Sequence, residues 1–375
     1  MNTLIPSYRT NDTKDEELSA LYNHINQDQK IDYACPWNRL RIREDESEED
    51  VKFLVNVGDE FEVPFNQHFQ RQLSGTLAPG LDRYGRELLE RGENKLFADN
   101  HNRLLALGDG RKAQIRTLSN GVPQHARAFL SDAYRSIDDD VVFGEALPII
   151  GEHKDTFQAI GGKRTDYKTY LKIVTREPSL EINSGSRIRK FHAGFILSNS
   201  EVGSGFAEFS AFLTDSFCNN GCIFSKIDIA TVKFAHRGTR ISTDFGEIMG
   251  SQIEKAKELE IRGLIQDATN HACDVEKLRP ALDMMERAAS CEITGDPIKV
   301  LEHIGNRVKL SKSEVEKVAL HFYPDETNLL GVNSAITALA QECGSYERRI
   351  ELEKAGAMAL NLGDSKAWSA IEGLS

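Results

Sequence analysis

The fold is decided by three stretches in the middle of the chain: Thr165–Thr175 (TDYKTYLKIVT), Arg187–Leu197 (RIRKFHAGFIL) and Phe206–Leu213 (FAEFSAFL). In the first stretch, Leu171 and Ile173 alternate with Lys168, Tyr170 and Lys172. A period of two is typical of a strand with one buried and one solvent-exposed face. We therefore expect three strands here, the second and third rich in phenylalanine.

Turn residues separate these strands. Asn183-Ser184-Gly185 and Glu201-Val202-Gly203 lie between them, and Gly161-Gly162 precedes the first. Such turns predict an antiparallel meander over residues 155–225. After Asp244 the apolar spacing becomes helical, and Ser311 with Glu314 forms a capping box. The sequence predicts an α+β fold, with a central antiparallel sheet followed by a helical C-terminal third.

Weaker signals precede the sheet. Val51–Val55 and Phe61–Val63 resemble short strands, Arg83–Arg91 resembles a helix, and Gly108-Asp109-Gly110 reads as a hairpin turn. The acidic run Glu44–Asp50 is interpreted as an exposed loop in preference to a tail that mimics nucleic acid. We divide the chain into an N-terminal extension with short strands and an acidic loop (1–100), a sheet-containing core (101–245) and a helical region (246–375).

Composition narrows the class of protein. Hydrophobic residues make up 40% and charged residues 28% of the 375 positions, which excludes a fully disordered chain. No apolar run approaches the length of a membrane span, and the first residues lack the pattern of a secretory signal. We expect a cytoplasmic protein with no membrane partner.

The charge is unevenly distributed. The net charge of -12 comprises -8 over residues 1–101, +4 over 102–199 and -8 over 200–375. The stretch from Lys163 to Lys190 carries eight basic and three acidic residues. Within it, Lys168-x-Tyr170-x-Lys172 places a ring between two cations on the expected wet face. Cations that neutralise phosphates beside a stacking ring suit single-stranded DNA.

The predicted DNA-binding residues come from two neighbouring strands and their entry turn: Lys163, Arg164, Lys168, Tyr170, Lys172, Arg187, Arg189 and Lys190. The alternative is a sheet face whose cations are solvated and pair with the acidic flanks. A charge cluster alone leaves the two interpretations equally weighted.

Catalytic and metal motifs are missing from the sequence. Asp138-Asp139-Asp140 could bind magnesium, but acidic residues also favour a helix start, and we prefer that role. Cys218 and Cys222 have no second pair to complete a zinc site, so we expect reduced thiols and no metal. We expect no cofactor and favour a non-enzymatic function.

Four blocks resemble a family of phage- and plasmid-borne proteins without an assigned function. The blocks are His125–Asp138, Gly194–Gly203, Phe217–Gly221, and Asn333–Thr337 with Arg348–Glu353. The resemblance implies a mobile-element protein. The sheet-plus-helix layout is also distantly similar to phage single-strand annealing proteins, which form rings or filaments and hold DNA in a basic groove. From position alone, Glu201 at a strand end is expected to pair with Arg127 or Arg135.

The leading hypothesis is a single-stranded DNA-binding and annealing protein of a phage or plasmid. It would act in recombination or replication, as a homo-oligomer. The alternative is a regulatory or anti-defence factor whose acidic surface binds a host or phage protein. A third hypothesis, a nuclease or other enzyme, is supported only by Asp138–Asp140.

Overall fold

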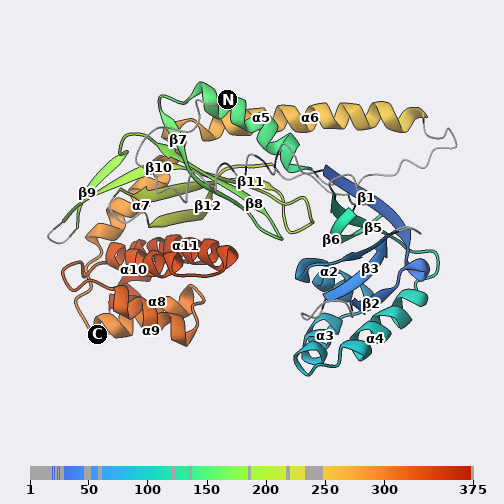
Figure 1. The fold of residues 1–375 in the computed structure, drawn as a ribbon. Helices are drawn as coiled ribbons and strands as arrows, with labels where there is room; N and C mark the ends of the chain where they lie inside the picture. The colour runs from blue at the N-terminus through green and yellow to red at the C-terminus, as the bar shows by residue number, and fades with distance from the viewer. Residues whose placement is uncertain are drawn as a thin grey trace.

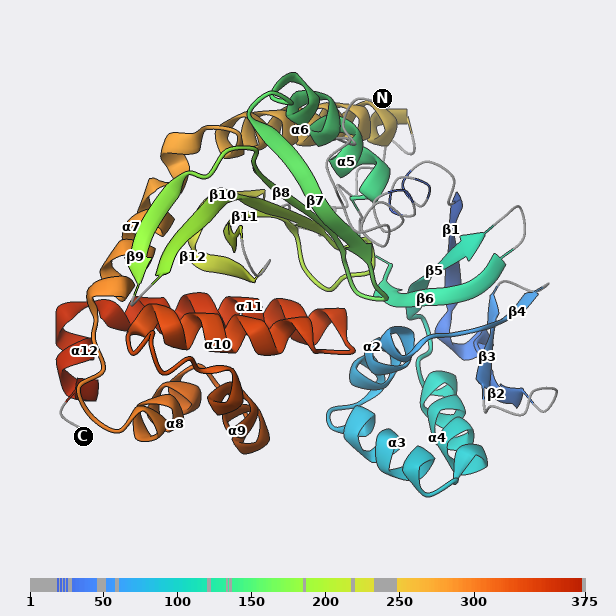
Figure 2. The ribbon, with the colours of Figure 1, turned by 60° about the vertical axis from the view of Figure 1, so that its left-hand side comes forward.

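The structure, a computed structural model, describes residues 19, 21, 23, 25, 29–45, 52–57, 61–119, 123–132, 134, 137–184, 187–216, 220–232 and 248–372. Its elements form two lobes that lie side by side (Figure 1, Figure 2). The small lobe is the described part of residues 29–131. The large lobe is the described part of 137–372, together with Leu21 and Ile25, whose side chains join its core.

The large lobe is built on one antiparallel sheet, as predicted. Its described strands, in spatial order, are β12 (Gly221–Val232), β11 (Ala207–Asp215), β10 (Arg187–Asn199), β8 (Thr169–Thr175) and β7 (Phe157–Arg164), with β9 (Leu180–Ser184) beside β10. The three predicted strands correspond to β8, β10 and β11. Gly161-Gly162 was expected to turn, but both glycines lie inside β7 and pair with β8.

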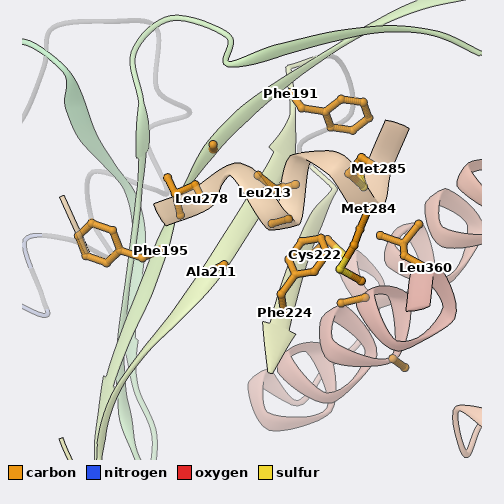
Figure 3. Close-up of a cluster of buried hydrophobic side chains, with 14 of the residues drawn as sticks. Phe191, Phe195, Ala211, Leu213, Cys222, Phe224, Leu278, Met284, Met285 and Leu360 are labelled. Carbon is orange, nitrogen blue, oxygen red and sulfur yellow. The ribbon is translucent and has the colours of Figure 1, made fainter. Parts of the chain in front are cut away.

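Apolar side chains cover both faces of this sheet. Leu171, Ile173 and Phe195 belong to the main core, which they share with α5 (Asp139–Glu152) and α6 (Ile248–Ala272). Figure 3 shows the part of this core where Phe191, Leu213 and Phe224 meet methionines of α7 (Arg279–Ser290). The opposite face carries a smaller cluster that includes Ile350 of α11 (Tyr346–Leu360).

The C-terminal third is helical, as the change of period predicts. After α6 and α7 come α8 (Pro297–Arg307), α9 (Lys312–His321), α10 (Leu329–Gln341), α11 and α12 (Ser365–Glu372). The capping box at the start of α9 is confirmed, since Ser311 and Glu314 bond to each other's backbone amides. Among the described residues, no helix is both long enough and apolar enough to cross a membrane.

The small lobe combines two sheets with three helices around a separate core. The sheets, in spatial order, are β1 (Gln29–Pro36), β5 (Lys112–Ser119) and β6 (Pro123–Ser131), and β2 (Ile42–Asp45), β3 (Lys52–Val57) and β4 (Phe61–Pro64). The helices are α2 (Gln67–Leu77), α3 (Leu81–Glu90) and α4 (Asn94–Ala106).

Two expectations change in the small lobe. The Gly108–Gly110 turn was predicted to join two strands. It joins α4 to β5 instead, because the apolar run before it lies at the C-terminal end of a helix, where Leu105 is buried and Leu107 is exposed. In the acidic run, Glu44 and Asp45 belong to β2, and residues 46–50 lie outside the described residues.

Candidate functional site

The predicted wet face of β8 is buried. Tyr170 and Lys172 are 7% and 4% exposed, because α11 packs on this face. Lys172 Nζ donates to both carboxylate oxygens of Glu353 at 2.7 Å, and the rings of Tyr170 and Tyr346 lie 5.4 Å apart. The expectation that these two side chains form an exposed face was wrong. The alternation of the two faces was predicted correctly, but the polar face carries a buried ion pair.

Two of the three predicted cations of β10, Arg189 and Lys190, are also partnered. Arg189 binds Asp215 and, at 3.0 Å, Glu326 from the loop before α10. Lys190 is exposed and pairs with Glu181 of β9 at 2.6 Å. Arg187 lies in β10, and its side chain is outside the described set. The alternative interpretation, in which the cations of the sheet pair with acidic residues, is therefore correct for Lys172, Arg189 and Lys190.

The end of the β7–β8 hairpin differs from the rest of the predicted surface. Lys163 is exposed and Lys168 is half-buried, and neither has a carboxylate from the described residues within 4.0 Å of its ammonium. Arg71, exposed on α2, donates to the Tyr167 hydroxyl at 3.2 Å. Arg71 and Tyr167 were missed by sequence analysis, because the contact joins residues 96 positions apart.

Lys168 lies in a close-fitting environment. A Cβ on Gly205 would come within 2.7 Å of its Nζ, so the lysine side chain lies across this glycine. Burial lowers the pKa of Lys168, although the more distant Glu208 carboxylate acts in the opposite direction. A half-buried ammonium with no described carboxylate at ion-pair distance is the kind of group that an incoming anion stabilises.

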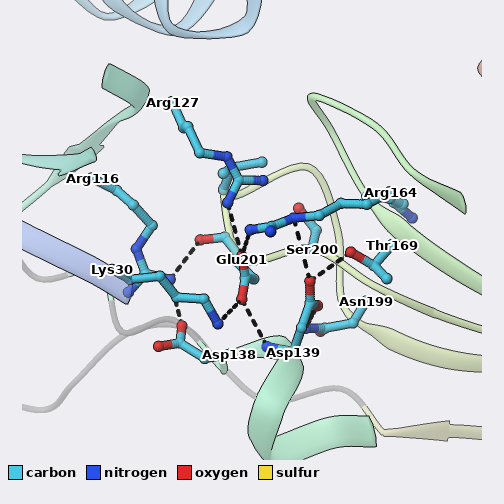
Figure 4. A network of polar contacts seen from close by, with 12 residues as sticks. Lys30, Arg116, Arg127, Asp138, Asp139, Arg164, Thr169, Asn199, Ser200 and Glu201 are labelled. Atoms are coloured by element: carbon cyan, nitrogen blue, oxygen red, sulfur yellow. Dashed lines mark hydrogen bonds and ion pairs between the residues drawn. The ribbon is translucent and has the colours of Figure 1, made fainter. Parts of the chain in front are cut away.

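The second polar site lies between the lobes, around Glu201 (Figure 4). The Glu201 side chain is 1% exposed and binds three cations: Lys30 of β1, Arg127 of β6 at 2.9 Å and Arg164 of β7 at 2.9 Å. It also accepts the Asp139 backbone N–H at 2.8 Å, at the start of α5. The expected pairing of Glu201 with Arg127 is confirmed, and Arg135 lies outside the described residues.

A second buried carboxylate, Asp139, lies beside Glu201. Its oxygens accept hydrogen bonds from the Thr169 hydroxyl and, at 2.8 Å, from the Asn199 amide. Burial and the nearby negative charge of Glu201 raise the pKa of Asp139 to about 6. Burial alone would raise the pKa of Glu201, but Lys30, Arg164 and Arg127 outweigh it and hold that pKa well below its usual range.

The three aspartates at residues 138–140 contact protein cations. Arg116 of β5 bridges Asp32, at 2.8 Å, and Asp138, and Lys30 lies 3.3 Å from Asp140. Asp138 is the N-cap of α5, which agrees with the preferred role as a helix start. Among the described residues, no three or more His, Cys, Asp or Glu side chains gather as metal ligands. Cys218 lies outside them, and Cys222 is a buried thiol that accepts a contact from Asn333.

One buried pair has the composition of a nucleophile and its base. Ser74 Oγ lies 2.8 Å from His101 Nε2, and His101 Nδ1 donates to the Phe97 carbonyl. Both Ser74 and His101 are 0% exposed. The pair has no access to a substrate and instead ties α2 to α4.

The structure also places the four sequence blocks relative to one another. The first two blocks meet at Arg127 and Glu201. The last two meet where Asn220 of the Phe217–Gly221 block donates to the Ser334 carbonyl at 3.3 Å. Comparisons with protein-family models, with curated proteins and with solved structures found no match. The family resemblance therefore rests on the blocks themselves.

Proposed function

We propose that the protein binds single-stranded DNA for a phage or plasmid, in recombination or replication and without a cofactor. The proposed surface is the end of the β7–β8 hairpin with α2, and consists of Lys163, Lys168, Arg71 and Tyr167. The observation that carries the proposal is the half-buried Lys168 ammonium with no described carboxylate at ion-pair distance.

Each of the four residues has a chemical role in this proposal. Lys163, Lys168 and Arg71 would neutralise phosphates, which is the main source of affinity for nucleic acid. The half-exposed Tyr167 ring, packed edge-on against His68 at 4.9 Å, would stack on an unpaired base. Stacking requires an unpaired base, so single strands should bind more tightly than duplex.

The test is fluorescence anisotropy with labelled single-stranded oligothymidine and a matched duplex over a series of salt concentrations. Lys163→Ala, Lys168→Ala and Arg71→Ala should each weaken binding and flatten the dependence on log salt by about 0.7 per lost contact. Tyr167→Phe keeps the ring and should bind normally, while Tyr167→Ala should cost about 1–3 kcal/mol.

Lys190→Ala is the matched control, because Lys190 is an exposed lysine of the same sheet that already pairs with Glu181. It should bind like the wild type. Wild-type protein that binds neither DNA at low salt would refute the proposal and favour the protein-partner alternative. Equal losses in Lys190→Ala and Lys168→Ala would show that binding is a diffuse charge effect.

A further inference from the structure

The two lobes have separate apolar cores. The small-lobe core surrounds Phe69 and Phe97, whereas the large-lobe core surrounds Phe143 and Phe195. Between them, the described residues form one small apolar cluster, made by Ala128, Leu130 and Val202 with Tyr134 packed against it. The boundary therefore lacks the continuous apolar contact that fixes two parts of a chain as one rigid core.

Polar contacts replace that apolar contact, and most of them converge on one loop of the large lobe. Lys30 and Arg127 of the small lobe bind the Glu201 carboxylate. The Val202 carbonyl accepts hydrogen bonds from Gln72 at 2.6 Å and contacts His68 Nε2 at 2.9 Å.

Ions buried in this way hold a specific geometry without adding much net stability. Removing two charges from water costs about as much free energy as their attraction returns, so a buried pair is weak evidence for strong cohesion. Removing one partner is costly, because the other charges stay buried without compensation. We therefore expect such an interface to be either closed or open, because a state with only some of its ion pairs formed is unstable.

We propose that Glu201 forms an ionic latch with Lys30 and Arg127 of the small lobe, supported by Arg164 of its own lobe, and that this latch holds two independently packed lobes in one orientation and releases them when the Glu201 charge is lost. The chain itself crosses the boundary close to the latch. Leu21 and Ile25 pack in the large lobe before β1 starts in the small lobe, and the chain returns between β6 and α5. The first crossing lies beside the latch residue Lys30, and the second ends at Asp139, whose backbone N–H donates to Glu201.

The protein carries a natural reporter for each lobe. It has two tryptophans, and Trp37 is buried in the small-lobe core while Trp368 is buried in the large-lobe core. Trp368→Phe leaves Trp37 as the reporter, and Trp37→Phe leaves Trp368. Urea unfolding followed by fluorescence then gives one midpoint for each lobe.

With the latch intact, the two midpoints should coincide. In the Glu201→Gln background they should separate, and small-angle X-ray scattering without urea should show a larger radius of gyration. Glu353→Gln is the matched control, because Glu353 is equally buried but binds Lys172 and Arg349 of its own lobe. It should lower both midpoints together and leave the radius of gyration unchanged.

Coincident midpoints in Glu201→Gln would overturn the latch, as would separate midpoints in the protein with Glu201 intact. If Glu201→Gln fails to fold, Arg127→Gln decides the matter, because it removes one cation that crosses the boundary and leaves Lys30 and Arg164 on the Glu201 carboxylate. Its two midpoints should separate, and coincident midpoints in this variant would exclude the latch.

Discussion

At the scale of single residues, Asp139 is a side chain whose negative charge is unfavourable in the folded protein. Its carboxylate is 2% exposed and lies next to the negative charge of Glu201. Arg164, at 3.9 Å, is a more distant partner for Asp139 than it is for Glu201. Two neighbouring carboxylates with pKa values shifted in opposite directions then make opposite contributions to stability as the pH changes.

We expect Asp139 to make the protein less stable as the pH rises. Its pKa is about 6 in the folded chain and 3.8 ordinarily, so between these values the folded state binds the extra proton. The free energy of unfolding should therefore fall as pH rises through this window. Asp139→Asn should remove that fall, as measured by urea unfolding across the pH range. The pKa of Glu201 lies below its ordinary value of 4.5, so protonation of Glu201 lowers the free energy of unfolding only at pH values below that ordinary value. If the free energy of unfolding of Asp139→Asn still falls as pH rises through this window, another titrating group causes the fall.

Gly194 in β10 leaves no room for a side chain. A Cβ there would lie 1.9 Å from the carbonyl oxygen of Ile173 in β8. Gly194→Ala should therefore destabilise the sheet by about 1–3 kcal/mol or prevent folding, since the clash is with backbone. Gly161→Ala in β7 is the control, because no atom lies within 4 Å of its Cβ position. Equal unfolding midpoints for the two variants would contradict this account.

At the scale of elements, α11 determines that the polar face of β8 is buried. Lys172 was predicted to point away from the apolar core, and it does. The periodicity of β8 gave no sign that a helix more than 170 residues later supplies Glu353 to that face. Local patterns predict a strand and its two faces, because they depend on neighbouring residues. What covers a polar face depends on long-range packing, which one strand does not encode.

The same distinction explains the other outcomes. The helical third and the capping box at Ser311 follow from local signals and were predicted. The Glu201–Arg127 pair was predicted because a strand end offered one acid and nearby blocks offered arginines. Lys30 and Arg71 were missed, since each belongs to an element whose position against the large lobe is set by tertiary packing.

The Lys172–Glu353 pair provides a test at this scale. Lys172→Met should cost about 3–5 kcal/mol, because among the described residues it leaves the buried Glu353 carboxylate with Arg349, at 3.2 Å, as its one cation. The double variant Lys172→Met/Glu353→Leu should be more stable than Lys172→Met, since it also removes the stranded charge. Lys190→Met, which breaks the exposed pair with Glu181, should cost about 0–1 kcal/mol. A double variant that unfolds at lower urea than Lys172→Met would contradict this.

At the scale of the whole molecule, contacts between distant segments compensate part of the uneven charge of the sequence. The basic middle third supplies Arg164, Lys172 and Arg189, and the acidic last segment supplies their partners, which include Glu201, Glu326 and Glu353. Lys163 and Lys168 at the β7–β8 hairpin have no such partner among the described carboxylates. Arg71, which adjoins them, belongs to the other lobe.

A surface that includes both lobes makes a prediction that combines the two proposals. If oligothymidine contacts Arg71 on the small lobe together with Lys163 and Lys168 on the large lobe, the bound strand should couple the lobes where the latch is broken. In Glu201→Gln, saturating oligothymidine should bring the Trp37 and Trp368 unfolding midpoints back together. Ligand at 100 times its Kd stabilises the bound state by about 2.7 kcal/mol, which is large enough to measure.

Arg71→Ala in the same background separates this effect from simple stabilisation. Without Arg71 the strand should still contact the large lobe, so the Trp368 midpoint should rise while the Trp37 midpoint stays where it is without DNA. Anisotropy at the same salt concentration confirms that the strand is bound in each variant. If DNA raises only the Trp368 midpoint while Arg71 is intact, the binding surface belongs to the large lobe alone, and Arg71 serves only to position Tyr167.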